Sequence, residues 1–157
     1  MMTGGPVLLV PFQDPVNVGA VVRSAAAFGV RNVVLLREAA TPFHPKSIRA
    51  GGSTVFLALF HEGPSIRDIR ETFPGPVVAL SMDGEDIDRF EFPETFALLP
   101  GMEGQGLPEG IEFDHRVRIP MEPEVESLNA AAATAVALYE WKRRKKPEKI
   151  QEYRRVT

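Results

Sequence analysis

The sequence predicts one α/β domain built around a parallel sheet of about five or six strands. Two observations lead to this class: short apolar runs alternate with segments of helical periodicity, and 157 residues suffice for one domain with its own core. Runs that are apolar throughout are typical of strands buried on both faces of a parallel sheet. No repeat, linker or low-complexity segment divides the chain, so residues 1–157 are expected to form a single domain.

The first elements form a strand–helix–strand unit. Val7–Phe12 is an apolar run between Gly-Pro and Gln-Asp-Pro, and it predicts a buried strand. Asn17 opens a helix whose apolar residues recur at helical spacing, and Gly29 supplies its stop. Asn32–Leu36 is the second strand. Such a unit makes the right-handed crossover from which α/β sheets are built.

The later segments continue this alternation. Residues 39–53 contain two prolines and a Gly-Gly pair, and we expect a loop with one helical turn. The remaining strands are predicted over Val55–His61, Pro76–Met82, Thr95–Leu99 and Arg116–Ile119. One helix is predicted over Pro64–Phe73. Asp83–Phe92 is expected to be an acidic irregular segment, and Pro100–Pro108 a loop.

The last predicted element is a helix rich in alanine. Pro120 ends the preceding strand, and Ser127 is expected to cap the N-terminus of the helix. The run Leu128–Tyr139 contains no Gly or Pro. Its small side chains would let another backbone or a ligand approach closely, although a well-packed terminal helix explains the alanines equally well.

Composition excludes several kinds of site. Cys is absent, which removes disulfides, thiolate catalysis and Cys-ligated zinc. His44, His61 and His115 lack metal-ligand spacing, so no metal is predicted. The N-terminus lacks a secretory signal, and its apolar run is too short to span a bilayer. We therefore expect a soluble, cytoplasmic protein without a membrane partner.

The net charge of −3 hides an uneven distribution. Residues 142–157 hold 8 Lys or Arg and 2 acidic residues, whereas the rest of the chain holds 10 basic and 19 acidic residues. A basic tail of this kind can attract phosphates. It can equally be a solvated helix end, because cations are favourable near a helix C-terminus.

A first polar motif follows the first predicted strand. Asp14–Ala20 and then Arg23 lie where ligands bind in α/β proteins, at the carboxyl ends of the strands. Asn17 could simply cap its helix. Arg23 shares a helix stripe with small residues, which leaves room for a planar or phosphorylated group, and an ordinary surface Arg is the alternative.

Two further motifs follow later strands. Gly101–Leu107 holds three glycines, which permit a ligand to pass close to the backbone. It is neither GxGxxG nor a P-loop, so a dinucleotide or triphosphate is disfavoured, and a tight turn without a ligand is the alternative. Ser127 and Asn129 stand at an expected helix N-terminus, where an anion can be held. Capping alone would also explain Ser127.

Together, DPVNVGAVVRSAAAFG, LLPGMEGQGLP and IPMEPEVESLNAAAATAVALYEW resemble, in order and spacing, the SpoU (TrmH-like) family of RNA 2′-O-ribose methyltransferases of the SPOUT superfamily. The resemblance covers most of the chain. It implies that residues 1–157 are the family's catalytic domain, with the basic tail 142–157. Unlike many relatives, the chain is expected to have no separate RNA-binding domain. The resemblance implies helices on both faces of the parallel sheet, a C-terminal deep trefoil knot, and a homodimer through the first and last helices that completes the site.

The resemblance also implies S-adenosylmethionine as cofactor, held mostly by backbone inside the knot, and no metal. The residues implied to bind the cofactor are Leu80, Ser81, Met82, Gly101, Glu103, Gly104, Gly106, Ile119, Pro120, Met121, Ser127, Leu128 and Asn129.

Catalytic roles follow from the same match. Arg23 matches the catalytic arginine; because a guanidinium stays protonated near neutral pH it is a poor base, and we expect it to stabilise a developing alkoxide and anchor a phosphate. Base action stays open if RNA perturbs it. Asn17 is expected to position Arg23, Glu103 to organise its loop, and Ser127 and Asn129 to form the third polar pair. The expected RNA contacts are Arg23, Lys46, Arg49, Lys142, Arg143 and Arg144.

The predicted reaction is methyl transfer to a ribose 2′-hydroxyl of tRNA or rRNA. Met102 stands where the family often carries a small or polar residue, and the loop FHPKSIRAGGS matches the family only loosely, so the modified nucleotide is not predicted. Two alternatives are methylation of a base nitrogen by the same fold and an RNA-binding relative that does not catalyse.

Overall fold

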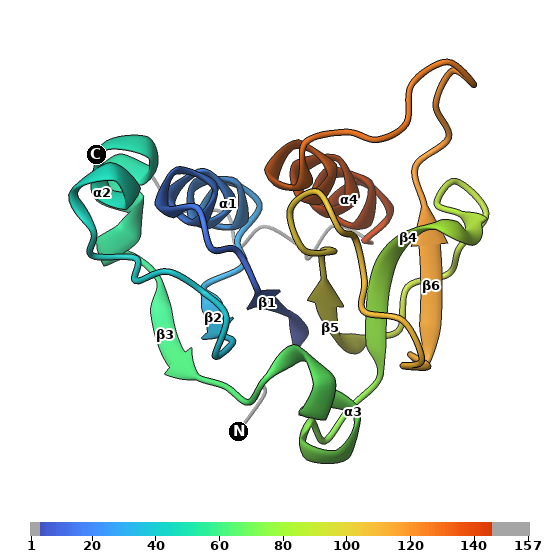
Figure 1. Ribbon diagram of the computed structural model, residues 1–157, viewed down its shortest axis with the longest axis horizontal. Coiled ribbons are helices and arrows are strands. Elements are labelled where there is room, and N and C mark those ends of the chain that lie inside the picture. Colours follow the sequence, from blue (N-terminus) through green and yellow to red (C-terminus); the bar gives the residue numbers. More distant parts are fainter. Residues whose placement is uncertain (1–3, 146–157) are drawn as a thin grey trace, which may run out of the picture.

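The computed structural model describes residues 4–145, which form a parallel sheet with helices on both of its faces (Figure 1). The strand order is β3-β2-β1-β5-β4-β6, and every paired strand runs parallel to its neighbour. The strands are β1 (Gly5–Val10), β2 (Asn32–Leu35), β3 (Leu59–Glu62), β4 (Val77–Asp86), β5 (Thr95–Leu99) and β6 (His115–Arg118). The helices are α1 (Pro15–Ala27), α2 (Pro45–Gly51), α3 (Ile69–Thr72) and α4 (Ala130–Arg144), with 3-10 turns η1 (Gly52–Phe56) and η2 (Ile66–Asp68). The six strands confirm the predicted class.

Side chains of β1 alternate between two apolar layers. Leu8 and Val10 pack in the layer under α1 and α4, whereas Val7 and Leu9 pack in the layer that contains Ile69 of α3. Figure 1 shows the same division, with α1, α2 and α4 on one face and α3 on the other. Burial on both faces explains why this strand reads as an uninterrupted apolar run.

The first helix begins earlier than predicted. Pro15 is its first residue, and the carboxylate of Asp14 caps it by accepting a 2.9 Å hydrogen bond from the Val16 N–H. Asn17 therefore lies in the first turn and does not cap the helix. Its side chain is free for the contacts described below.

Two segments contain more regular structure than their sequences indicated. Residues 45–51 form α2, whose N-terminus is capped by the Nδ1 atom of His44, and η1 follows, so β3 starts only at Leu59. β4 extends to Asp86 through a shift in its pairing with β6 between Leu80 and Glu85. The shift brings Gly84 so close to β6 that an added Cβ would lie 2.4 Å from the backbone of Arg116. A bulge of this kind leaves no periodic signal.

The final helix differs from its prediction at both ends. α4 begins at Ala130 and is capped by Asn129, whose Oδ1 accepts hydrogen bonds from Ala131 N (2.9 Å) and Ala132 N (3.2 Å). Ser127 is not the cap. The helix continues to Arg144.

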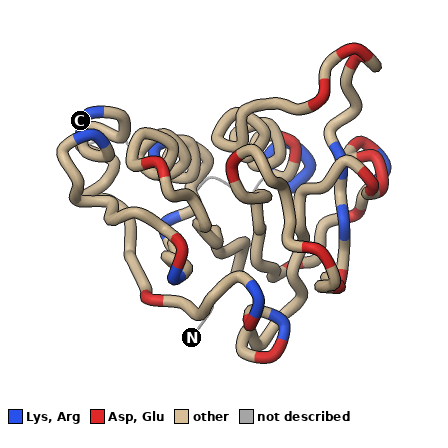
Figure 2. Tube along the Cα trace, in the orientation of Figure 1, with Lys and Arg blue, Asp and Glu red and all other residues tan. Residues whose placement is uncertain are grey.

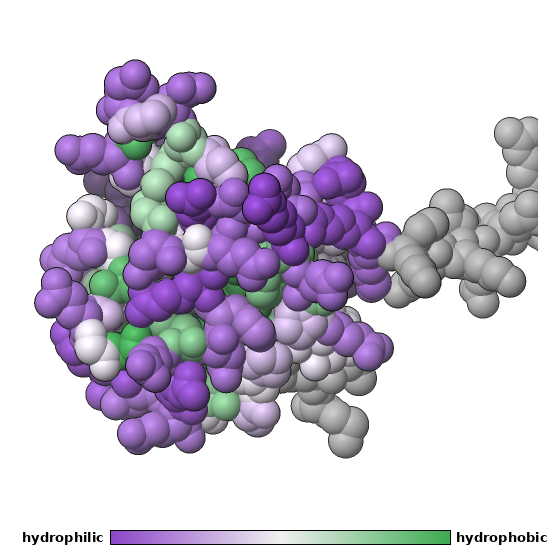
Figure 3. Space-filling view, turned by 90° about the vertical axis from the view of Figure 1, so that its right-hand side faces the viewer, coloured by the Kyte–Doolittle hydropathy of each residue, from purple (hydrophilic) through white to green (hydrophobic). Residues whose placement is uncertain are grey.

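Strand β6 forms one edge of the sheet, and the face of the molecule on this side is largely hydrophilic (Figure 3). Among residues 4–145, no helix combines the length and apolar character needed to cross a membrane.

Candidate active site

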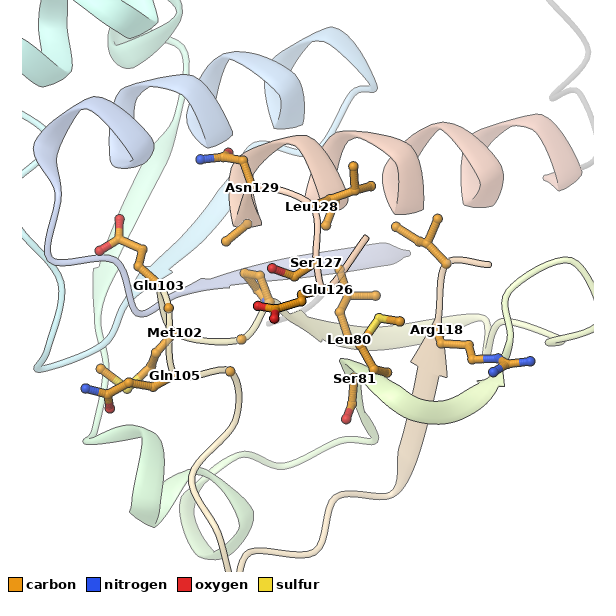
Figure 4. A pocket seen from close by; sticks show the side chains of 18 of the residues that line it. Leu80, Ser81, Met102, Glu103, Gln105, Arg118, Glu126, Ser127, Leu128 and Asn129 are labelled. Carbon is orange, nitrogen blue, oxygen red and sulfur yellow. The ribbon is translucent and has the colours of Figure 1, made fainter. Parts of the chain in front are cut away.

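A cavity of about 500 Å³ lies at the carboxyl ends of β4, β5 and β6 and beside the start of α4 (Figure 4). This is the edge of an α/β sheet at which ligands bind. The predicted cofactor residues that line it are Leu80, Ser81, Met82, Gly101, Glu103, Gly104, Gly106, Ile119, Met121, Ser127, Leu128 and Asn129. Pro120 is exposed and lies outside the lining.

The glycine loop after β5 is closed by its own backbone. Met102 and Gly106 exchange two 2.9 Å hydrogen bonds, and Gly104 and Gly106 have φ angles of +70° and +68°. An added Cβ on Gly101 would lie 3.1 Å from the backbone of Gly106. The loop therefore needs glycine for its turn and for close backbone contact, and it presents main chain to the cavity.

The carboxylate of Glu103 reaches from this loop to the start of α1 (Figure 4). Its oxygens accept hydrogen bonds from Gln13 N (3.2 Å), Asp14 N (3.2 Å) and Asn17 Nδ2 (2.6 Å). An anion at a helix N-terminus is stabilised by the free N–H groups and the helix dipole. Glu103 thus fixes the glycine loop to the first motif.

Asn17 joins this arrangement to the third motif. Its Oδ1 accepts a 3.3 Å hydrogen bond from Nδ2 of Asn129, while its Nδ2 donates to Glu103. Because Oδ1 of Asn129 caps α4, the amide of Asn129 is oriented by its own helix. The three motifs therefore form one hydrogen-bonded chain at the rim of the cavity.

The end of β4 is held by a second polar cluster. The Ser81 hydroxyl donates to Asp83, and Arg116 lies 3.4 Å from both of them and donates to Ile111 O at 2.9 Å. The Ser81 hydrogen bond, with help from Arg116, lowers the pKa of the Asp83 carboxyl. The Ser81 hydroxyl is thus occupied within this cluster.

Arg23 does not line the cavity. It is exposed on α1, and among residues 4–145 no carboxylate pairs with it. Within one chain the structure therefore brings together Asn17, Glu103, Ser127 and Asn129 but leaves Arg23 on the helix surface.

The other residues predicted to contact RNA have different surroundings. Lys46, Arg49 and Lys142 are exposed. Arg143 is exposed and pairs with Glu140 at 2.7 Å. Arg144 donates to Glu140, Phe90 O and Ile87 O with all three guanidinium nitrogens, so it holds α4 in place and has little capacity for a phosphate. Residues 146–157 of the basic tail lie outside the described residues.

The sequence analysis missed several polar residues of the lining, namely Gln105, Arg118 and Glu126. Gln105 and Glu126 each adjoin a predicted site residue, so their position in the motifs was the available signal. Arg118 ends β6 and turns toward Asp86; their hydrogen bond lowers the pKa of Asp86 and raises that of Arg118. Only the bulge in β4 places Asp86 opposite Arg118, which sequence spacing does not indicate.

The sequence was compared with models of known protein families. The model of the SpoU rRNA Methylase family matches residues 6–139. The chain belongs to this family. The predicted SpoU resemblance is thereby confirmed.

Curated relatives share this SpoU region. The protein of Syntrophobacter fumaroxidans named ribosomal RNA small subunit methyltransferase G 2 is 53% identical over 136 residues, which cover 87% of this chain and 27% of that protein. The 23S rRNA (uridine(2479)-2′-O)-methyltransferase of Streptomyces viridochromogenes is 32% identical over 138 residues, which cover 81% of this chain and 48% of that protein. The chain thus spans less than half of the length of these two relatives.

Solved structures share the SpoU fold. The AdoMet-bound rRNA methyltransferase from Sinorhizobium meliloti has a TM-score of 0.81 and 31% identity, over 92% of this chain and 59% of that one. A structure from a study of 2-OH methylation of C/U34 on tRNA has a TM-score of 0.76 and 35% identity, over 88% of this chain and 95% of that one.

Proposed function

We propose that this SpoU domain transfers a methyl group from S-adenosylmethionine to a ribose 2′-hydroxyl of RNA. The observation that carries the proposal is the hydrogen-bonded chain of Glu103, Asn17 and Asn129, which joins all three motifs at the rim of one cavity. Relatives named as 23S rRNA 2′-O-methyltransferases support the same reaction.

The cavity suits S-adenosylmethionine in size and chemistry. Its volume of about 500 Å³ falls within the roughly 300–1,000 Å³ of small-molecule sites. Leu80, Ile119 and Leu128 offer apolar surface to an adenine, and the main chain of residues 101–106 offers hydrogen-bonding groups. When bound, S-adenosylmethionine supplies an electrophilic methyl group on its sulfonium.

The chain must then orient the ribose oxygen and favour its negative charge. Bound cofactor would supply the methyl group to the 2′-oxygen, which would give up its proton as the new bond forms. We assign Arg23 to stabilising the developing alkoxide and the adjacent phosphate, because a guanidinium is a strong donor and a poor base. Asn17 and Asn129 orient the substrate side of the cavity, and Glu103 holds the loop in register. Ser127, which is exposed at the lining, is assigned to a substrate or cofactor contact.

Arg23 does not reach the cavity of its own chain, but in a homodimer it could reach the cavity of the other subunit. α1 and α4 lie side by side in Figure 1, and Phe28 and Tyr139 meet with ring centroids 6.1 Å apart. Their outer faces expose Val16 (45%), Val136 (41%) and Tyr139 (55%), which a second copy would cover. We therefore propose that Arg23 completes the site of the other subunit. The trefoil knot of the family remains a prediction for this chain.

The domain's own surface is assigned to holding RNA. Figure 2 shows Lys and Arg on α2 and α1, whereas the segment between β6 and α4 carries acidic residues. Lys46 and Arg49 on α2, with Lys142 at the end of α4, are the proposed phosphate contacts. The reaction is placed in the cytoplasm, where rRNA and tRNA substrates occur.

One experiment tests the proposed reaction. The purified chain is incubated with methyl-labelled S-adenosylmethionine and either bulk tRNA or rRNA, and the RNA is digested to nucleosides for mass analysis. We expect a 2′-O-methylnucleoside. A methylated base would replace the proposal with the base methyltransferase, and RNA binding without any methylated product would favour the relative that does not catalyse.

A further inference from the structure

An exposed aromatic side chain lies outside the candidate active site, against the edge strand β3 of the sheet. Phe43, which precedes α2, has 56% of its surface exposed. Its ring meets the ring of Phe60 nearly edge-on, with centroids 5.6 Å apart and an interplanar angle of 77°. Phe60 supports Phe43 from one side and leaves more than half of it open to solvent. Exposing an aromatic ring loses the stabilisation of burial, so a role outside the core is the natural explanation.

The loop that carries Phe43 is tied to the start of α1. The Phe43 N–H donates to Thr41 Oγ1 at 3.2 Å, and the buried Ser47 hydroxyl lies 2.9 Å from Thr41 O and 2.8 Å from Pro15 O. Pro15 follows Asp14, whose N–H donates to Glu103. Short hydrogen-bonded steps therefore connect the loop to the cavity rim.

The same stretch of chain is basic and contains no acid. Between residues 39 and 61 there is no Asp or Glu, although the chain holds 21 acidic residues. Lys46 and Arg49 fall in this stretch, are exposed, and have no carboxylate partner among residues 4–145. An exposed ring next to unpaired cations is complementary to a polyanion that also offers flat, unpaired bases.

We propose that Phe43 is a stacking site for an unpaired base of the RNA substrate, with Lys46 and Arg49 beside the neighbouring phosphates. The proposal rests on the proposed function, because it takes RNA as the substrate. Sequence-specific RNA recognition relies on unpaired bases that stack on aromatic side chains. Phe43 would thereby hold the RNA on the α2 side of the domain without touching the reacting atoms.

The chain offers a matched control in Phe56. This side chain is 71% exposed, but its exposed neighbours are apolar, namely Leu57 (50%) and Leu59 (58%). It lies in η1, next to the amino end of β3, where Leu59 N donates to Arg31 O. Removing this ring tests the loss of an exposed Phe whose exposed neighbours are apolar.

Binding measurements test the site directly. Phe43→Ala, Phe43→Leu and Phe43→Tyr are compared with the wild type and Phe56→Ala for affinity to bulk tRNA and to a labelled 12-nucleotide single-stranded RNA. We expect Phe43→Ala and Phe43→Leu to weaken binding about tenfold, since stacking on an aromatic ring contributes on that order per base. Phe43→Tyr and Phe56→Ala should bind like the wild type. In methyl transfer, the KM for RNA should rise while the Kd for S-adenosylmethionine stays constant.

A spectroscopic measurement separates stacking from general loss of structure. The chain has one Trp, Trp141, which is only 8% exposed and gives a constant background. Phe43→Trp adds an exposed reporter, and we expect its fluorescence to be quenched by the 12-nucleotide RNA. Phe56→Trp should not be quenched.

The outcomes distinguish this proposal from the proposed function. If the wild type methylates RNA but Phe43→Ala retains the wild-type KM and affinity, the stacking site is wrong and the reaction stands. Equal quenching of both Trp variants, or equal weakening by Phe56→Ala, also overturns the site. If the wild type neither binds nor methylates RNA, both proposals fail.

Discussion

The side-chain amide of Asn17 donates a 2.6 Å hydrogen bond to Oε1 of Glu103 and so joins the first two motifs across 86 positions of sequence. The bond links the first turn of α1 to the glycine loop after β5. Because Glu103 also accepts backbone N–H groups at the start of α1, the charge of its carboxylate is well compensated. The pair is therefore expected to act as one unit.

A double-mutant cycle measures this unit. Asn17→Ala and Glu103→Ala should each lower kcat/KM for methyl transfer, and the double variant should lose much less than the sum of the two single losses. We expect a coupling free energy on the order of 1–3 kcal/mol, typical of contacting polar residues. Strict additivity would show that the 2.6 Å contact does not govern the reaction.

The glycine loop gives a second prediction. Gly106 and Gly110 have φ angles of +68° and +78°, and a Cβ added to either meets no atom within 4 Å. Gly106→Ala and Gly110→Ala should therefore both lower the free energy of unfolding by about 1–2 kcal/mol. Of these two glycines, Gly106 lines the cavity and Gly110 does not. We therefore expect Gly106→Ala, and not Gly110→Ala, to weaken S-adenosylmethionine binding in a calorimetric titration. Equal Kd values of the two variants for S-adenosylmethionine would show that the cofactor does not bind at this loop.

Arg23 gives a prediction about subunits. Arg23→Ala should lower kcat at least about 100-fold, a usual cost of removing a group that stabilises transition-state charge, while cofactor affinity stays near the wild-type value. Arg31 is also exposed and lies just before the amino end of β2, so Arg31→Ala serves as the control and should be active.

Mixing two impaired variants tests whether Arg23 acts across an interface. A heterodimer of Arg23→Ala with Gly106→Ala would contain one site with an intact cofactor loop and an intact Arg23 from the other chain. Activity should therefore return on mixing. Failure to recover activity in heterodimers isolated through a different affinity tag on each variant would place Arg23 in the site of its own chain.

The basic surface of α2 gives a prediction about salt. Lys46→Gln and Arg49→Gln should each weaken RNA binding and reduce the slope of log K against log salt by about 0.7–0.9, the value for one phosphate contact. Arg67→Gln, which changes an exposed Arg on the face with α3, should leave the slope unchanged. If all three variants keep the wild-type slope of log K against log salt, α2 does not contact the RNA phosphates.

A last prediction concerns pH. Hydrogen bonds from Arg143 and then Arg144 lower the pKa of Glu140 below its ordinary value of 4.5. A carboxylate with a depressed folded pKa stabilises the fold above its unfolded pKa, and this contribution is lost as pH falls through the folded pKa. Glu140→Gln should therefore lower Tm by roughly 2–4 °C at pH 7, and the difference should shrink below about pH 4.5. Asp83 and Asp86 titrate in both proteins, so their contributions cancel in the difference in Tm. A difference in Tm that does not change with pH would show that Glu140 is not the group responsible.

Much of the fold was readable in the sequence because its signals are local. Continuous apolar runs such as Thr95–Leu99 mark buried strands, and the alanine run before Trp141 marks a helix. The spacing of three polar motifs was enough to predict the SpoU family, which the family model confirms. These features depend on residues near one another in sequence.

The tertiary structure decided what local signals do not encode. The strand order places Asn17 against Glu103 and Asn129, which are 86 and 112 positions away. The structure also makes Asn129, and not Ser127, the cap of α4. The same packing commits Arg144 to the backbone of residues 87–90 and leaves Arg23 outside the cavity. Side-chain partners across a sheet follow from which strands are neighbours. That order results from the packing of whole elements and not from the periodicity of any one of them.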